Sequence, residues 1–155
     1  MTLFRAFLRD ERGSPAAEMV LMLPLLLMLM FGGLEAGHFF WREHQVVKAA
    51  REGARFAGRQ TMAGYNCVDR TVDASVIDLA RIEEVTKANL VGDVDVSVTV
   101  VGCAPDSQYG IYADKPDGAP IVRVAVVMNY PALMAYMILP DLRLNATAQT
   151  AVMGL

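Results

Sequence analysis

The residues best suited to chemistry in this 155-residue chain are its two cysteines, Cys67 and Cys103. A zinc site would need about four Cys, His or carboxylate ligands, and no such set accompanies them. A disulfide in an oxidising compartment is therefore the favoured interpretation. It would close a loop of about 37 residues and stabilise the surrounding region by about 4 kcal/mol. Two unpaired thiols in a core are the alternative.

The other reactive side chains form no catalytic pattern. The two histidines, His38 and His44, are six residues apart, which places them about 240° apart on a helix, so they cannot share a metal ion. Glu83 and Glu84 are adjacent and point apart on a helix. The sequence has no glycine-rich phosphate loop after a strand and no Ser/His/Asp or Cys/His set. We therefore expect a protein that is not an enzyme and has no metal, cofactor or small-molecule substrate.

The charge distribution argues against nucleic acid as a partner. Residues 1–60 carry eight Lys/Arg against six Asp/Glu, whereas residues 61–155 carry six against eleven. An acidic region repels phosphate, and affinity for nucleic acid comes mainly from cationic groups. Hydrophobic residues make up 54% of the chain and charged residues 20%, a composition that excludes intrinsic disorder.

An apolar run from Met19 to Leu34 contains no charged residue. It is slightly shorter than the roughly 18 residues expected of a membrane-spanning helix. Over Met19–Trp41, however, seven Leu, three Phe and one Val favour insertion by about 5 kcal/mol, against a cost of up to about 2.5 kcal/mol for Glu35. A transmembrane segment at about 19–41, with lipid as its partner, is therefore expected. Pro24 agrees with this, since membrane helices tolerate proline.

Two alternatives to a retained membrane helix are a secretory signal peptide and a buried core helix. A signal peptide has roughly 7 to 15 apolar residues closed by a small-residue cleavage site, whereas this pattern continues helically for about two dozen residues beyond Glu35. Phe39, Phe40 and Trp41 are typical of an aromatic belt at a membrane interface. These features favour a retained span.

Small residues predict close packing along one long helix over residues 14–60. Gly33 and Gly37 have the small-xxx-small spacing that brings membrane helices together. Beyond the apolar run, a stripe of small residues lies opposite a charged face, and its partner is either the chain's own C-terminal region or neighbouring helices. The residues assigned to helix packing are Gly33, Gly37, Ala50, Gly53 and Ala57.

Residues 61–155, here called the head, predict an α+β domain. Apolar spacing predicts a helix over Asp73–Leu90, ended by Gly92. Valines alternating with polar residues predict a strand over Val94–Val100, and two further strands are expected at about 121–129 and 142–152. One-sided alternation indicates a three-stranded antiparallel sheet packed against helix on one face.

Two connections in the head are less regular. A Gly/Pro/Asp-rich loop is expected from Gly102 to Pro120, with Cys103 near its start. The apolar stretch Pro131–Pro140 is interpreted as a short helix that closes the core, with an exposed contact patch as the alternative.

Glu18 lies at the start of the apolar run, where a carboxylate is costly unless paired. Gly13 and four small residues precede it. In these positions the sequence resembles the TadE-like family of pseudopilins, minor components of Flp-type tight-adherence pili. The resemblance covers residues 1–60 and is carried by three stretches: RGSPAAEMVLMLP from Arg12, GGLEAG from Gly32 and AAREGARFA from Ala49.

The resemblance implies processing by a prepilin peptidase that cuts between Gly13 and Ser14. Residues 1–13 would be the leader, and Glu18 would be the glutamate five residues beyond the cut. Glu18 would be recognised during processing or would pair with the new amine at Ser14 of a neighbouring subunit. Met19 departs from the tyrosine that often follows this glutamate.

The resemblance further implies a pilin-like, single-pass protein of a bacterial inner membrane, with a cytoplasmic N-terminus and a periplasmic head. Its partners would be the prepilin peptidase, other pilin or pseudopilin subunits and the Tad assembly machinery, with incorporation into an extracellular pilus left open. Counting Lys/Arg near the span would instead place the head in the cytoplasm, whereas a disulfide favours the periplasm. An uncleaved membrane-anchored adapter is one alternative. A type II secretion pseudopilin is another, although those proteins usually begin with phenylalanine and not with a residue like Ser14.

Overall fold

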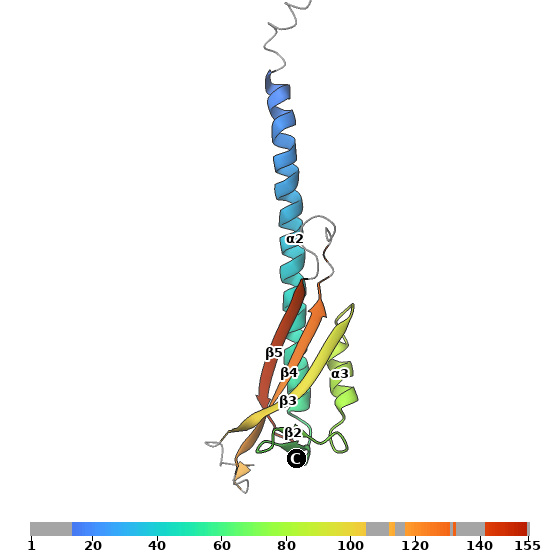
Figure 1. The fold of residues 1–155 in the computed structure, drawn as a ribbon, viewed down its shortest axis with the longest axis vertical. Coiled ribbons are helices and arrows are strands. Elements are labelled where there is room, and N and C mark those ends of the chain that lie inside the picture. Colours follow the sequence, from blue (N-terminus) through green and yellow to red (C-terminus); the bar gives the residue numbers. More distant parts are fainter. Residues whose placement is uncertain (1–13, 105–111, 114–116, 131, 133–141, 155) are drawn as a thin grey trace, which may run out of the picture. The chain divides into compact units, whose positions relative to one another are not determined.

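The computed structural model describes residues 14–104, 112–113, 117–130, 132 and 142–154. The chain divides into two compact units, Met1–His38 and Phe39–Leu155. A long apolar helix comes first in the chain, followed by a second helix and a three-stranded antiparallel sheet (Figure 1). This arrangement confirms the predicted α+β class.

Helix α2 (Ser14–Ala57) is 44 residues long and contains the whole apolar run. It ends three residues earlier than predicted. Gly58 still donates to the Ala54 carbonyl at 2.8 Å, but Arg59 and Gln60 each donate to a carbonyl only three residues back, at 3.1 Å. This tightening of the last turn ends the helix.

The apolar run of α2 is exposed in the N-terminal unit. Among the described residues, one helix is long and apolar enough to cross a membrane, and none of its apolar window is buried within the chain. Leu21 is 80% exposed and Met28 is 72% exposed. A soluble core helix would bury such side chains, so this exposure argues against that alternative.

The sheet has the order β3-β4-β5 and is formed by β3 (Val94–Ala104), β4 (Ala119–Asn129) and β5 (Arg143–Ala151). Both pairings are antiparallel. Alternate residues of the central strand β4, from Val122 to Met128, are fully buried. The alternating valines of the sequence therefore predicted the strands correctly.

The sheet extends into the region predicted as a loop. A register shift between Val100 and Gly102 lets β3 continue to Ala104, and Cys103 lies opposite Pro120 at the start of β4. The expectation of a loop over the whole of 102–120 was therefore wrong at both ends. Pro120 is tolerated because it lies near the first residue of its strand. The stretch predicted as a short helix, Pro131–Pro140, lies outside the described residues apart from Ala132.

Helix α3 (Leu79–Lys87) is shorter than the predicted helix over Asp73–Leu90. The Asp73 carboxylate accepts hydrogen bonds from the Ser75 amide at 2.9 Å and from its hydroxyl at 2.6 Å, which forms a turn in place of a helical start. Asp78 then caps α3 by accepting from the Arg81 amide at 2.9 Å.

A small hairpin precedes α3 and was not expected. It pairs β1 (Tyr65–Asn66) with β2 (Thr71–Val72). The Asn66 side-chain oxygen accepts from the amides of Val68 and Asp69 at 3.0 Å, and Arg70 has a positive φ of 56°. Two-residue strands are too short to show an alternating pattern, so side-chain hydrogen bonding of the turn determines this hairpin.

The core of the C-terminal unit lies between the sheet and the helices. The end of α2 contributes a stripe of fully buried residues, and β4 contributes the largest buried side chains. Gly53 lies where α2 meets α3 and the sheet. A methyl group there would fall on Thr86 Oγ1 and within 3.2 Å of Val124 Cγ1. Gly53 thus allows α2 to approach both neighbours closely.

We expect Gly53→Ala to destabilise the C-terminal unit by about 1–3 kcal/mol, because overpacking outweighs the gain in helix propensity of about 1 kcal/mol. Adding Thr86→Ala should recover part of that loss, since it removes the hydroxyl on which the new methyl group falls. The measurement is urea unfolding of the four proteins of this cycle in detergent. Gly37→Ala is the control, because nothing lies within 4 Å of its added methyl group. Equal stability of wild type and Gly53→Ala would contradict the close approach.

Candidate functional site

The predicted processing segment lies at the start of α2. Gly13 is outside the described residues, and Ser14 is the first residue of the helix. Glu18 is exposed on α2 one turn later. Exposed apolar side chains follow from Met19 onward. Within the described residues, Glu18 is therefore the one carboxylate that precedes a continuous apolar surface.

The five small residues predicted for helix packing fall into two sets. Ala50, Gly53 and Ala57 are buried in the C-terminal unit, where they contact the chain's own sheet and α3. Gly33 and Gly37 are exposed, with nothing within 4 Å of an added methyl group. Of the two partners considered for the stripe, the chain's own C-terminal region is the one that covers it. The two exposed glycines remain candidates for contact with another helix.

The residues predicted as an aromatic belt do not all share one environment. Phe39 packs edge-on against Tyr130, with ring centroids 5.3 Å apart, and is partly buried against the core. Phe40 and Trp41 are 57% and 54% exposed, and the Arg42 guanidinium lies 5.1 Å from the Trp41 ring. Of the three residues, Phe40 and Trp41 are thus exposed as the predicted belt requires, while Phe39 packs within the C-terminal unit.

Cys67 and Cys103 form a disulfide, with their Cα atoms 5.0 Å apart. The bond links the β1–β2 hairpin to the last residues of β3. The alternative of two unpaired core thiols therefore does not hold in this structure.

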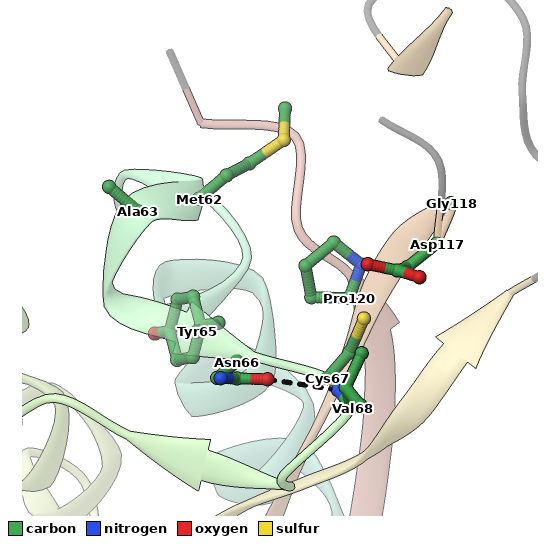
Figure 2. A pocket seen from close by; sticks show the side chains of 9 residues that line it. All are labelled: Met62, Ala63, Tyr65, Asn66, Cys67, Val68, Asp117, Gly118 and Pro120. Carbon is green, nitrogen blue, oxygen red and sulfur yellow. Dashed lines mark hydrogen bonds between the residues drawn. The ribbon is translucent and has the colours of Figure 1, made fainter. Parts of the chain in front are cut away.

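A cavity of about 360 Å³ lies beside the disulfide (Figure 2). The hairpin supplies Tyr65 and Asn66, and the start of β4 supplies Pro120. Asp117 provides a carboxylate, and the sulfur of Cys67 is held in the disulfide and cannot act as a nucleophile. Among the described residues, no group of three or more His, Cys, Asp and Glu is placed to bind a metal ion.

Tyr65 joins this hairpin to the end of α2. Its hydroxyl donates to the Ala57 carbonyl at 3.1 Å, and the side chain is 4% exposed. Burial raises the pKa of Tyr65 from 10.0 to about 12. The Ala57 carbonyl at the end of α2, which also accepts from the Gln60 amide, thus receives a second hydrogen bond. No periodic pattern in the sequence indicated this contact.

The raised pKa of Tyr65 predicts a loss of stability at high pH. Below pH 10 the phenol is protonated in both the folded and the unfolded chain, so its contribution is fully present. Between pH 10 and about 12 the unfolded chain ionises first, and about 2–3 kcal/mol of unfolding free energy should be lost.

Urea unfolding measured from pH 9 to pH 12 tests this expectation for Tyr65. Tyr65→Phe removes the hydrogen bond, so its free energy of unfolding at pH 9 should be about 1 kcal/mol lower than that of the wild type. Its free energy of unfolding should, however, change less with pH. Tyr112→Phe is the matched control, because it removes another hydroxyl that donates to a backbone carbonyl, that of Val152. Identical pH dependence in wild type and Tyr65→Phe would contradict the assignment.

A second cavity, of about 550 Å³, lies between α2 and the end of β5. The Lys48 Nζ lies 3.9 Å from the Glu52 Oε1, whereas the guanidinium groups of Arg51 and Arg55 have no hydrogen bond or ion pair with any described residue. We call this cavity the cationic groove; it is lined by Lys48, Arg51, Glu52, Ala54, Arg55, Ala148, Gln149 and Thr150. Sequence reasoning missed it because its two sides are about 100 residues apart in the chain, and only the α2 charges were visible as a repeat.

Comparison with protein families connects the apolar helix to a known group. Residues 13–55 match the family model described as TadE-like protein. This match spans less than a third of the chain, and we call residues 13–55 the TadE-like segment. This finding confirms the resemblance seen in the sequence. Comparison with curated proteins and with solved structures found no match.

The TadE-like segment begins at Gly13, immediately before the first residue of α2. It includes the exposed apolar run and most of the buried stripe, and it ends at Arg55 within the cationic groove. A TadE-like segment together with an exposed, apolar N-terminal helix fits a membrane protein related to Tad pili.

Proposed function

We propose that this chain is a pseudopilin that acts in the assembly of Flp-type tight-adherence pili, and so in surface attachment. It acts by assembly and carries out no reaction. A prepilin peptidase removes residues 1–13, and the mature chain begins at Ser14. The protein crosses the bacterial inner membrane once, with its N-terminus in the cytoplasm and its disulfide-bonded head in the periplasm.

The observation that carries this proposal is an apolar helix, within a TadE-like segment, that the described part of the chain leaves uncovered. The side chains from Met19 to Phe31 are exposed, several of them by more than half. Burying them in lipid, and then against other subunits, removes this apolar surface from water. Gly33 and Gly37 are exposed on the same helix, and small residues of this kind allow close approach of a second membrane helix.

Glu18 gives the proposed assembly its register. An exposed carboxylate at the start of an apolar helix is unfavourable in lipid unless a cation compensates it. Cleavage after Gly13 creates such a cation at Ser14. The amine of one subunit would therefore pair with Glu18 of its neighbour, in an environment where water screens the pair weakly.

Glu18→Ala tests the proposed function. If the peptidase needs Glu18 for recognition, the variant should keep residues 1–13. If Glu18 instead pairs between subunits, processing should be normal but pilus output should fall about tenfold or more, because the amine at Ser14 is then left unpaired in an apolar setting.

The readouts are the mass of the protein in native membranes and the amount of sheared pili. Glu43→Ala is the matched control, because Glu43 is an exposed glutamate on the same helix but outside the apolar run. Normal processing together with normal piliation in Glu18→Ala would reject both roles of Glu18. A protein that keeps residues 1–13 in the wild type would instead indicate an uncleaved adapter.

A further inference from the structure

Opposite charges lie near the two edge strands of the sheet in the C-terminal unit, β5 and β3. On one side, residues 42–57 of α2 contain four Lys/Arg against two Asp/Glu, and the cationic groove lies between this helix and β5. On the other side, residues 78–95, which include α3 and the start of β3, contain five Asp/Glu against two Lys/Arg. We call Asp93 and Asp95, at the start of β3, the acidic corner.

The groups on both sides are available for a partner. Arg51 and Arg55 have no partner among the described residues. Asp93 and Asp95 are exposed, and their carboxylates too have no hydrogen bond or ion pair within the described part of the chain. By contrast, Glu83 and Glu84 are bound to Lys87 at 2.5 Å and Arg81 at 2.6 Å.

The backbone beside the groove is also available. The strand order β3-β4-β5 makes β5 an edge strand, bonded to β4 on one side only among the described strands. An edge strand presents unpaired amide and carbonyl groups that a second chain can use. The groove therefore combines free guanidinium groups with a free strand edge.

We propose that the cationic groove binds the acidic corner of a second copy of this chain. The two surfaces lie beside opposite edge strands, β5 and β3, so one partner copy cannot reach both at once and close a twofold dimer. Each added copy leaves one groove and one acidic corner free, and the association therefore extends from copy to copy. Charge complementarity of this kind sets orientation and register.

The register of the sheet gives the offset between copies. Val94 and Leu144 both pair with Met128, whereas Val100 and Thr150 both pair with Val122, six residues away. Asp93 and Asp95 at the start of β3 and the β5 side of the groove, Ala148–Thr150, thus lie toward opposite ends of the sheet as well as at its opposite edges. At about 3.3 Å per residue, neighbouring copies are offset by about 20 Å along the strands.

Anionic lipid is the other partner that a basic helix can attract. A rise of 1.5 Å per residue places Arg51 about 15 Å and Arg55 about 21 Å beyond Trp41 along α2. Both distances exceed the Debye length of about 8–10 Å at physiological salt, over which a charged membrane surface acts. The distance along the helix and the strand edge therefore favour a second copy.

Zero-length carbodiimide cross-linking tests the contact between copies, because it joins an amine directly to a carboxylate that touches it. Equal amounts of isotopically light and heavy full-length chain are placed together in neutral phosphatidylcholine vesicles. A mixed-isotope cross-link between Lys48 and Asp93 or Asp95 is expected. Arg55→Glu should lower its yield about tenfold, and adding Asp95→Arg should restore a cross-link from Lys48 to Asp93.

Arg59→Glu is the matched control, since it makes the same charge change on an exposed residue that does not line the groove. The cross-link yield of Arg59→Glu should stay within about twofold of the wild-type yield, because this surface charge is remote from the proposed contact. Absence of mixed-isotope cross-links, or an equal loss in Arg55→Glu and Arg59→Glu, would overturn the proposal. So would loss of the cross-link in vesicles containing phosphatidylglycerol, because anionic lipid would then occupy the groove in place of a second copy. Cleavage after Gly13 is not required, so this test stands apart from that of the proposed function.

Discussion

Replacing both cysteines by serine should lower the free energy of unfolding of the C-terminal unit by about 4 kcal/mol, the chain-entropy value for a closed loop of this length. The bond joins Cys67 to Cys103 across a sequence separation of 36. It anchors a hairpin whose two strands have only two residues each. Because small domains have only about 5–15 kcal/mol of stability, this loss is a large fraction of the total.

Urea unfolding of the full-length chain in detergent measures the effect of the Cys67→Ser, Cys103→Ser pair. The wild type with a reducing agent is the matched control, and it should approach the double variant. A double variant within about 1 kcal/mol of the oxidised wild type would show that the bond adds little beyond the contacts of the hairpin.

Leu29→Arg should abolish membrane insertion of α2. Leu29 is 65% exposed and lies near the middle of the expected span. Leucine favours insertion by about 0.3–0.6 kcal/mol and arginine opposes it by about 2.5–3.5 kcal/mol at a helix centre. The change of about 3–4 kcal/mol exceeds the net insertion energy of about 2.5 kcal/mol that remains once Glu35 is counted.

Carbonate extraction of membranes that contain the variant measures the fraction inserted after Leu29→Arg. Val68→Arg is the matched control, because Val68 is equally exposed, at 64%, but lies in the hairpin region of the C-terminal unit. That control should remain in the membrane. Retention of Leu29→Arg at the wild-type level would contradict a span centred on this part of the helix.

The sequence predicted the parts of the fold that depend on hydrophobic period. Val94, Val96, Val98 and Val100 alternate with polar residues, and this alternation found β3 without ambiguity. The start of the second helix was predicted wrongly. Helical apolar spacing continues through Val76, but the Asp73 side chain accepts a hydrogen bond from Ser75 and forms a turn there. A local side-chain hydrogen bond thus overrode a helical pattern.

The sequence could not identify which surface covers a stripe of small residues. The sequence is equally consistent with contact of this stripe, Ala50, Gly53 and Ala57, with another helix or with the chain's own sheet. The contact of Gly53 with Thr86 and Val124 resolves this, and it depends on segments far apart in the chain. The cationic groove escaped prediction for the same reason, since Arg55 and Gln149 are brought together only by the fold.

N-terminal sequencing of the protein from its native membrane tests the central claim most directly. The comparison is between cells with and without the prepilin peptidase. We predict a mature chain that starts at Ser14 when the peptidase is present, and a chain that retains residues 1–13 when it is absent. A chain that retains those residues in both cells, or that begins beyond the apolar run, would contradict a processed pseudopilin held in the membrane by its N-terminal helix.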